Sequence, residues 1–145
     1  NGIVMNSMTS KNVFFDTNIL CYAFDKADAK KQEKSKSLIA KSIKTGNGNI
    51  STQVLQEFYV VATIKLGISP EMTLTAMDSL EPLKMVIITP DLIRAAVKKQ
   101  SKFLLSFWDA LILQAAESSL SSILYTEDLN PDQVYGSVTA VNPFA

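Results

Sequence analysis

Four carboxylates in this chain each stand beside a short apolar run: Asp16, Glu57, Asp109 and Asp128. Acidic side chains next to core residues are costly to bury unless a cation occupies the space between them. A hard divalent ion is the simplest such cation, because Mg²⁺ and Mn²⁺ prefer carboxylate and water oxygens. The pattern therefore predicts a Mg²⁺ or Mn²⁺ site that is dispersed along the sequence and assembled only by folding.

The composition narrows the chemistry that such a site could perform. The sequence contains no histidine and a single cysteine, Cys21. The lack of histidine excludes Ser-His-Asp and Cys-His catalysis, imidazole bases and His-rich zinc sites. One cysteine cannot form an internal disulfide and fits a reducing compartment, so we expect a cytoplasmic protein in which Cys21 is a small buried side chain.

Length and charge predict one globular domain with no strong electrostatic bias. The chain has 145 residues, and its 14 Lys and Arg balance its 14 Asp and Glu. No net charge draws it to nucleic acid or to a membrane, although a local basic patch could still bind nucleic acid. No apolar run approaches the roughly 20 residues that span a bilayer. Residues 1–11 lack the features of a signal peptide, and we expect a tail or an added remnant there, followed by one domain over 12–145.

The order of the expected elements predicts the fold class. Strands are expected at 13–15, 49–50, 85–88, 121–125 and 137–141, and helices at 18–24, 27–44, 52–65, 70–80, from 90 onward and at 107–118. Strands that alternate with helices of about a dozen residues indicate an α/β fold with a mostly parallel sheet.

This arrangement can bring the four acids together. Asp16 ends the first strand, and Asp128 follows the strand at 121–125 by three residues, so both lie at the same rim of a parallel sheet. Sites in open parallel sheets form at the carboxyl ends of the strands, near the point where strand order reverses. Asp109 lies near the start of its expected helix, and Glu57 lies about a turn and a half into another. If those helices begin at the same rim, all four carboxylates can converge.

Each acid taken alone also has an ordinary structural explanation. Asp16 could cap the helix that follows it. Asp109 is the fourth residue of a capping-box pattern that begins at Ser106. Glu57 could be an exposed helix residue, and Asp128 lies in a sequence typical of a turn.

Five segments together are more specific than any single acid. They are FDTNIL at 15–20, QVLQEF at 53–58, SFWDALI at 106–112, LYTEDL at 124–129 and VNPF at 141–144. In this order they resemble the PIN-domain nucleases, particularly the small VapC-type ribonuclease toxins of prokaryotic toxin–antitoxin pairs, over about 12–144. The resemblance implies a PIN-like three-layer fold, with a mostly parallel central sheet flanked by helices, and metal-dependent cleavage of RNA phosphodiesters.

The resemblance also implies roles for individual residues. Asp16, Glu57, Asp109 and Asp128 match the acidic quartet of the family, Asn18 its polar residue beside the first acid, and Thr126 its hydroxyl two residues before the last acid. We expect Asp16 and Asp109 to bind Mg²⁺ or Mn²⁺ directly, with Glu57 and Asp128 completing the site directly or through water. The partners implied are an RNA substrate, a cognate antitoxin protein and a second copy in a homodimer, without a membrane.

Two further features bear on RNA binding. The expected helix at 27–44 is rich in lysine, and Lys30 and Lys34 are candidate phosphate contacts, although a solvated helix face explains them as well. Trp108 precedes a candidate metal ligand and could stack on a base, but a tryptophan in such an apolar setting is expected in the core.

Other enzymes with an aspartate after the first strand fit less well. A haloacid-dehalogenase-type phosphatase needs a second aspartate two residues later, where this chain has Asn18. A receiver domain needs a lysine at the end of a later strand, and none stands beside Tyr125 or Val141. The remaining alternative is a non-catalytic PIN-like module that binds RNA or protein.

Overall fold

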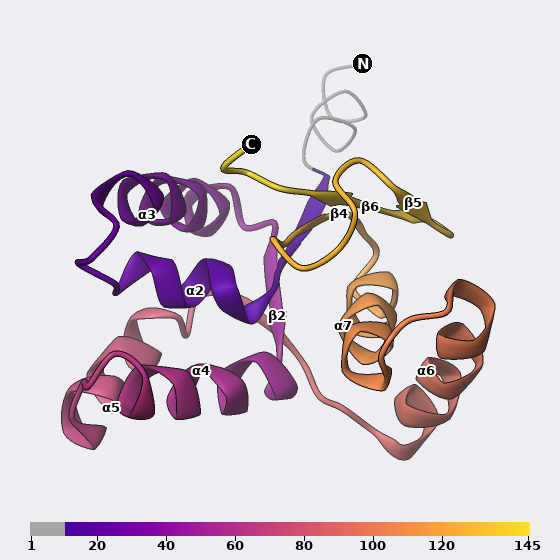
Figure 1. Ribbon diagram of the computed structural model, residues 1–145, viewed down its shortest axis with the longest axis horizontal. Helices are drawn as coiled ribbons and strands as arrows, with labels where there is room; N and C mark the ends of the chain where they lie inside the picture. The colour runs from indigo at the N-terminus through magenta and orange to yellow at the C-terminus, as the bar shows by residue number, and fades with distance from the viewer. Residues whose placement is uncertain (1–10) are drawn as a thin grey trace.

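The computed structural model describes residues 11–145, which form one six-stranded sheet with helices on both faces (Figure 1). The strands lie in the order β3-β2-β1-β4-β6-β5. Their bounds are β1 Asn12–Phe15, β2 Gly48–Ser51, β3 Lys84–Val86, β4 Ser121–Tyr125, β5 Val134–Tyr135 and β6 Val138–Val141. All neighbouring strands run parallel except β5 and β6, which are antiparallel.

Strand order reverses between β1 and β4. After β1 the chain builds outward through β2 and β3, and then returns to place β4 on the other side of β1. The register pairs Phe15 with Tyr125, whose rings stack with centroids 5.7 Å apart. The residues that follow these two strands therefore emerge side by side, at the place where open α/β sheets bind ligands.

Six helices have defined bounds in the described part of the chain, and each has a recognisable start. They are α2 Thr17–Ala23, α3 Ala29–Thr45, α4 Thr52–Ile64, α5 Pro70–Ser79, α6 Pro90–Phe103 and α7 Phe107–Ser118, numbered as in Figure 1.

 Ser51 caps α4 and Ser106 caps α7, each accepting a hydrogen bond from the backbone N–H three residues later.

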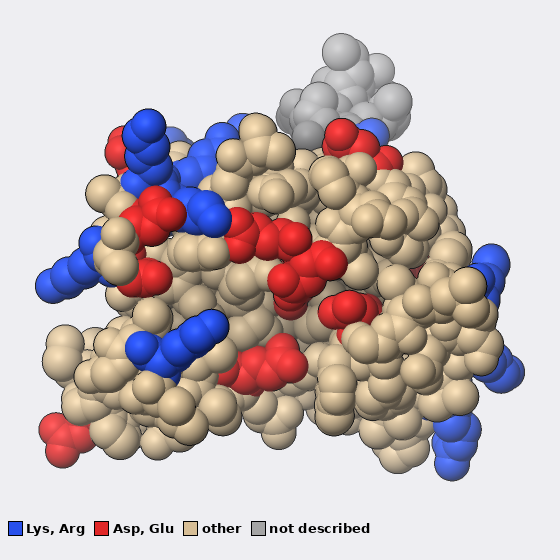
Figure 2. Space-filling view, viewed as in Figure 1, with Lys and Arg blue, Asp and Glu red and all other residues tan. Residues whose placement is uncertain are grey.

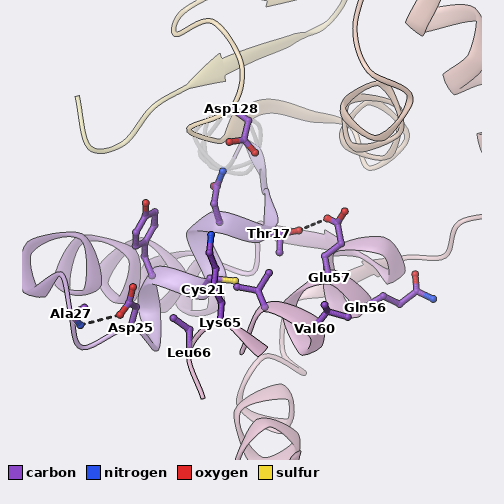
Figure 3. A pocket seen from close by; sticks show the side chains of 13 residues that line it. Thr17, Cys21, Asp25, Ala27, Gln56, Glu57, Val60, Lys65, Leu66 and Asp128 are labelled. Carbon is purple, nitrogen blue, oxygen red and sulfur yellow. Dashed lines mark hydrogen bonds between the residues drawn. The ribbon is translucent and has the colours of Figure 1, made fainter. Parts of the chain in front are cut away.

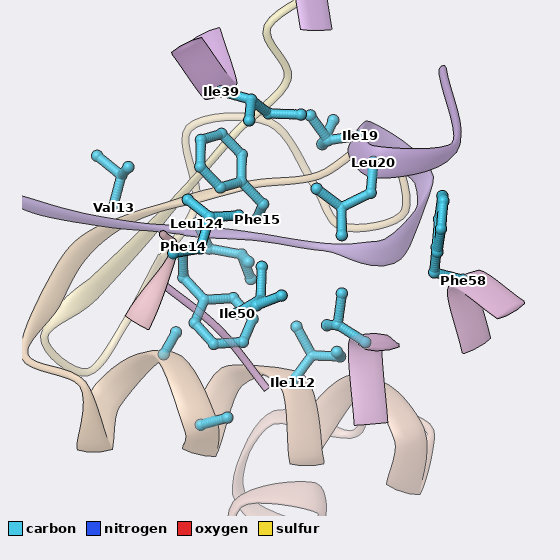
Figure 4. Packing of buried hydrophobic residues seen from close by; sticks show 14 of the residues in the cluster. Val13, Phe14, Phe15, Ile19, Leu20, Ile39, Ile50, Phe58, Ile112 and Leu124 are labelled. Carbon is cyan, nitrogen blue, oxygen red and sulfur yellow. The ribbon is translucent and has the colours of Figure 1, made fainter. Parts of the chain in front are cut away.

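The core lies on both faces of β1, because successive side chains of a strand point to opposite faces. Phe14 and Phe15 are both fully buried. Figure 4 shows Phe15 on the side of Ile19 and Ile39, which come from α2 and α3, while Phe14 lies on the side of Ile112 from α7. Helix α5 packs on α4, and α6 packs on α7. The sheet is thus the middle of three layers, and its two helical layers frame the rim that carries the site.

The predicted α/β fold with a mostly parallel sheet and flanking helices is confirmed. The short antiparallel strand β5 at Val134–Tyr135 was not expected, because two residues in a turn-rich stretch carry no readable periodicity. The predicted tail at 1–11 lies outside the described residues except for Lys11. Within residues 11–145, no helix is both long enough and apolar enough to cross a membrane.

Candidate active site

Asp16 and Thr126 meet where the order of the strands reverses. Asp16 follows β1 directly and Thr126 follows β4 directly, and both side chains are buried. The Thr126 hydroxyl donates a hydrogen bond of 2.7 Å to Asp16 Oδ2, while the Thr17 backbone N–H donates one of 2.7 Å to Asp16 Oδ1. Asp16 therefore caps α2, as its ordinary structural explanation requires, and also stands at the centre of the predicted site.

Glu57 reaches the same place from α4. The Thr17 hydroxyl donates a hydrogen bond of 2.6 Å to Glu57 Oε1, and the buried Gln53 amide lies 3.5 Å from Glu57 Oε2. Because Thr17 adjoins Asp16 in the chain, its hydroxyl ties Glu57 to the first acid. Glu57 is half-buried and hydrogen-bonded rather than an ordinary exposed helix residue.

Asp109 and Asp128 occupy the other side of the rim. Asp109 lies in the first turn of α7, where its backbone N–H donates to the Ser106 hydroxyl at 3.1 Å. Only this half of the capping box forms; within residues 11–145 the Asp109 carboxylate accepts no hydrogen bond. The Asp128 backbone N–H donates to the Thr126 hydroxyl at 3.0 Å. One hydroxyl therefore joins the first and last acids.

The four acids form one electrostatic group. Burial, together with the charges of Asp128 and Glu57, raises the pKa of Asp16 to about 7, against the lowering effect of its hydrogen bonds from Thr126 and Thr17. Burial also raises the pKa of Asp128, and the charge of Asp109 adds to this effect. Each of the four acids is therefore electrostatically coupled to at least one other, as expected for like charges that lie close together.

A hollow of about 920 Å³ opens beside these acids, between α2 and α4 (Figure 3). Its lining includes Asn18, Glu57 and Asp128, with Lys65 and Leu66 at the end of α4. Both polar atoms of the Asn18 amide are buried and have no hydrogen-bond partner. The Asn18 amide lowers the pKa of Asp128, against the raising effect of burial. The two side chains are close enough for this effect but do not form a hydrogen bond of ordinary geometry. The Asn18 amide in the wall of the hollow can therefore donate and accept hydrogen bonds that no described residue provides.

The donor set fits a hard divalent ion in kind, although the side chains stand apart. Among residues 11–145, no three Asp, Glu, Cys or His side chains lie close enough together to hold an ion directly. All the groups at the rim are nevertheless carboxylate, hydroxyl or amide oxygens, which suit Mg²⁺ and Mn²⁺. Because Mg²⁺ usually keeps several waters, an ion of this kind does not need direct contact with all four carboxylates.

Basic side chains surround the acids at a distance. Figure 2 shows acidic side chains across the middle of one face, with Lys and Arg mainly toward its margins. Lys30 and Lys34 are exposed on α3, and neither lines the hollow. Lys31 instead pairs with Glu127, the neighbour of Asp128, and this contact raises the pKa of Lys31 to about 12. Lys65 is the lysine that lines the hollow itself.

Three contributors to the site were not predicted from the sequence. Thr17 holds Glu57, and Gln53 donates to the Trp108 carbonyl oxygen at 3.3 Å as well as approaching Glu57. Gln53 stands four residues before Glu57, so helical periodicity could have placed the two on one face. Lys31 stands in a lysine-rich helix, and no local signal distinguishes it from its neighbours.

The expected core position of Trp108 is wrong. Its side chain is 61% exposed, whereas the buried face of α7 begins at Ala110. Trp108 lies in the first turn of α7, before the part of the helix that packs on the sheet. The apolar sequence around Trp108 therefore reflects the helix it begins and not its own burial.

Replacing Thr126 with valine tests the hydroxyl that joins Asp16 to Asp128. Valine keeps the shape of the side chain but removes the donor to Asp16 and the acceptor for the Asp128 N–H. Loss of such a supporting partner costs about 10- to 100-fold in metal affinity or activity. We expect Thr126→Val to reduce by that factor both the affinity for Mn²⁺, measured from thermal stability against Mn²⁺ concentration, and the rate of RNA cleavage. Thr126→Ser keeps the hydroxyl and should retain both properties; equal losses in the two variants would contradict this role.

Comparison with known proteins gives the same picture at the level of family and fold. The family model described as PIN domain matches residues 13–137. No curated protein sequence matches the chain significantly.

Several solved structures superpose closely. The VapC20 toxin of Mycobacterium tuberculosis, described as cleaving the sarcin–ricin loop, has a TM-score of 0.67 and 20% identity, covering 81% of this chain and 90% of that one. A toxin–antitoxin complex from Klebsiella pneumoniae has a TM-score of 0.68 and 20% identity, covering 91% and 98%. A DNA-bound VapBC from Salmonella typhimurium has a TM-score of 0.66 and 15% identity, covering 90% and 96%. At these identities the likeness shows a common fold.

Proposed function

Because this chain belongs to the PIN-domain family, whose model spans residues 13–137, we propose that it is a metal-dependent endoribonuclease. The observation that carries the proposal is the placement of four electrostatically coupled carboxylates around the point where strand order reverses, with the pKa of the buried Asp16 raised to about 7. A buried acid of this kind, repelled by its acidic neighbours, is typical of a site built for a cation.

The side chains have distinct roles in this proposal. Asp16 and Asp109 bind Mg²⁺ or Mn²⁺ directly, and Glu57 and Asp128 complete the site directly or through water. Thr126 orients Asp16 and Thr17 orients Glu57, through the hydrogen bonds described above. Asn18 faces Asp128 from the wall of the hollow. When bound, the ion supplies positive charge that shields the scissile phosphate and makes water a better nucleophile.

The protein partners follow from the relatives and from the exposed apolar surface. Solved structures of the same fold include toxin–antitoxin complexes, so we propose that this chain is the toxin of such a pair. Exposed apolar side chains on α4 and α5, among them Val60, Ile64 and Met72, offer a surface for an antitoxin or for a second copy in a homodimer. We place the pair in the cytoplasm, which suits the single buried Cys21.

One observation favours a non-catalytic PIN-like module that binds RNA or protein. In the described residues the carboxylates stand too far apart to hold an ion among three of them. A binding module would keep this separation, whereas a nuclease must bring the acids toward a common ion. The two functions therefore differ in whether metal is required for any change in RNA.

Cleavage of total RNA from a bacterial lysate by the purified full chain tests the proposed function. With Mg²⁺ or Mn²⁺ we expect discrete new RNA ends, mapped by sequencing, and with EDTA no new ends. Asp109→Asn should remove the same ends, because it neutralises a carboxylate that makes no other hydrogen bond in the described structure. Ends that persist in EDTA or in this variant would indicate a contaminating nuclease or another mechanism, and would contradict the proposal.

Salt dependence tests the proposed contacts of Lys30 and Lys34 with RNA phosphates. Replacing both with alanine should weaken RNA binding equally for different sequences. Two lost contacts should reduce the slope of log K against log salt by about 1.4 for single-stranded RNA. Replacing Lys41 and Lys44, which lie farther along α3, provides a charge-matched control. An unchanged slope in the Lys30 and Lys34 variant would remove these residues from the interface.

A further inference from the structure

Trp108 exposes a large aromatic side chain to solvent, one residue before the candidate metal ligand Asp109. The side chain is 61% exposed and directly precedes Asp109 in the chain. The part of α7 that packs on the sheet begins two residues later, at Ala110. The indole therefore contributes little to the core of this fold, although burial of its large aromatic surface would be favourable.

Two contacts involve Trp108, one at its backbone and one at its ring. The Gln53 amide, which is buried, donates to the Trp108 carbonyl oxygen at 3.3 Å and also approaches Glu57 Oε2 at 3.5 Å. The Phe107 ring meets the indole at a steep angle, with centroids 5.1 Å apart. The backbone of Trp108 is thus tied to the helix that carries Glu57, and its ring is held by a neighbour. An aromatic side chain that is already ordered loses little entropy when it binds.

The charges nearby favour a nucleobase as the ligand. The acids of the site repel RNA phosphates, so a strand that reaches the centre needs uncharged contacts there, and bases stack on aromatic side chains whatever their sequence. Bases inside a duplex are stacked on each other and cannot reach the indole.

From these contacts we propose that Trp108 is the stacking platform for one unpaired base next to the scissile phosphate. The proposal rests on the proposed ribonuclease function, and it requires the base that Trp108 contacts to be unpaired. Trp108 is a substrate-binding residue in this account, whereas Gln53 and Phe107 position it.

Intrinsic fluorescence tests the stack directly, because Trp108 is the sole tryptophan of the chain. The full chain carrying Asp16→Asn is titrated with a mixed-sequence, dye-labelled RNA of about 12 nucleotides. An abasic strand of the same length and a duplex of the same sequence serve as controls, and anisotropy of the dye reports binding. We expect saturable loss of tryptophan emission with the single strand, and no loss with either control.

Three results would overturn the stack. Constant emission while anisotropy shows that the single strand binds would leave the nuclease proposal intact but remove Trp108 from the interface. Equal loss of emission with the abasic strand would show that no base is involved. Emission that shifts with protein concentration before RNA is added would place the indole in a contact between copies. Failure of RNA to bind, together with failure of the wild-type chain to cleave, would instead reject both proposals.

Variants give an independent readout. Trp108→Leu keeps apolar bulk without a π face, and should weaken binding of the single strand about 5- to 100-fold, while Trp108→Phe keeps most of it. Binding of the abasic strand should not change in either variant, whereas a general structural defect would weaken both probes. Leu120→Ala, which alters an 82% exposed side chain beyond the other end of α7, is the matched control and should bind as the wild type does.

Discussion

Replacing Asp16 with asparagine should reduce RNA cleavage by more than about 100-fold and at the same time stabilise the metal-free protein. The decrease should exceed the roughly 10- to 100-fold typical of losing a supporting partner, because Asp16 is proposed to bind the ion itself. The gain in stability follows from burial, which raises the pKa of Asp16 to about 7. At pH 8 the wild-type chain must keep a buried charge that the variant lacks, so the variant should unfold at a higher temperature in EDTA.

Two other acids separate this prediction from a general effect of lost charge. Asp109→Asn should also abolish cleavage, but it should gain less stability, because Asp109 is only half-buried. Asp132→Asn should change neither property, because Asp132 is exposed in a turn whose positive φ of 66° asparagine tolerates. If Asp16→Asn unfolds at a lower temperature than the wild type in EDTA, the proposed cost of its buried charge is wrong.

The metal-free protein should lose stability as the pH rises from about 5 to 7. The pKa of Asp16 is about 7 in the folded state and 3.8 without the effects of folding, so between these pH values the folded state binds the extra proton. Stability from this group is therefore complete below the unfolded value and is lost as the pH rises through the folded one. At 1.36 kcal/mol per pKa unit, the decrease from pH 5 to pH 7 is about 2–3 kcal/mol.

Mn²⁺ should reverse this loss at the alkaline end. The ion binds the ionised carboxylate, so its stabilising effect should be small at pH 5 and larger at pH 8. At a concentration of about 100 times Kd, a ligand of the folded state adds about 2.7 kcal/mol. Urea unfolding across this pH range, with EDTA or with Mn²⁺, measures both effects. Asp16→Asn should flatten the two curves, and a wild-type stability that is indifferent to Mn²⁺ at pH 8 would count against the site.

The fold and the positions of the acids were readable from local patterns. A strand that ends at Asp16 and one that ends just before Thr126 predict neighbouring side chains once the sheet is parallel, because the carboxyl ends of such strands share a rim. The hydrogen bond of 2.7 Å between Thr126 and Asp16 agrees with that placement. The competing explanations were also partly right, since Asp16 caps α2 and Ser106 caps α7.

Other features depend on tertiary contacts that no local pattern encodes. The pairing of Lys31 with Glu127 joins residues 96 positions apart, and the link from Gln53 to Trp108 joins residues 55 positions apart. The exposure of Trp108 depends on where α7 meets the sheet, which its apolar neighbours conceal. The spacing of the four carboxylates depends in turn on side-chain positions and on bound cations, neither of which the sequence specifies.

The central claim is that Asp16, Glu57, Asp109 and Asp128 surround one metal centre. Crystals of the full chain grown with Mn²⁺ at pH 8 test it most directly, because anomalous scattering locates manganese independently of the protein model. We predict a manganese peak in direct contact with carboxylate oxygens of Asp16 and Asp109, at roughly 2.0–2.3 Å. Glu57 and Asp128 should lie in direct or water-mediated contact with the same ion. Well-ordered carboxylates with no manganese peak among them at saturating Mn²⁺ would contradict the account.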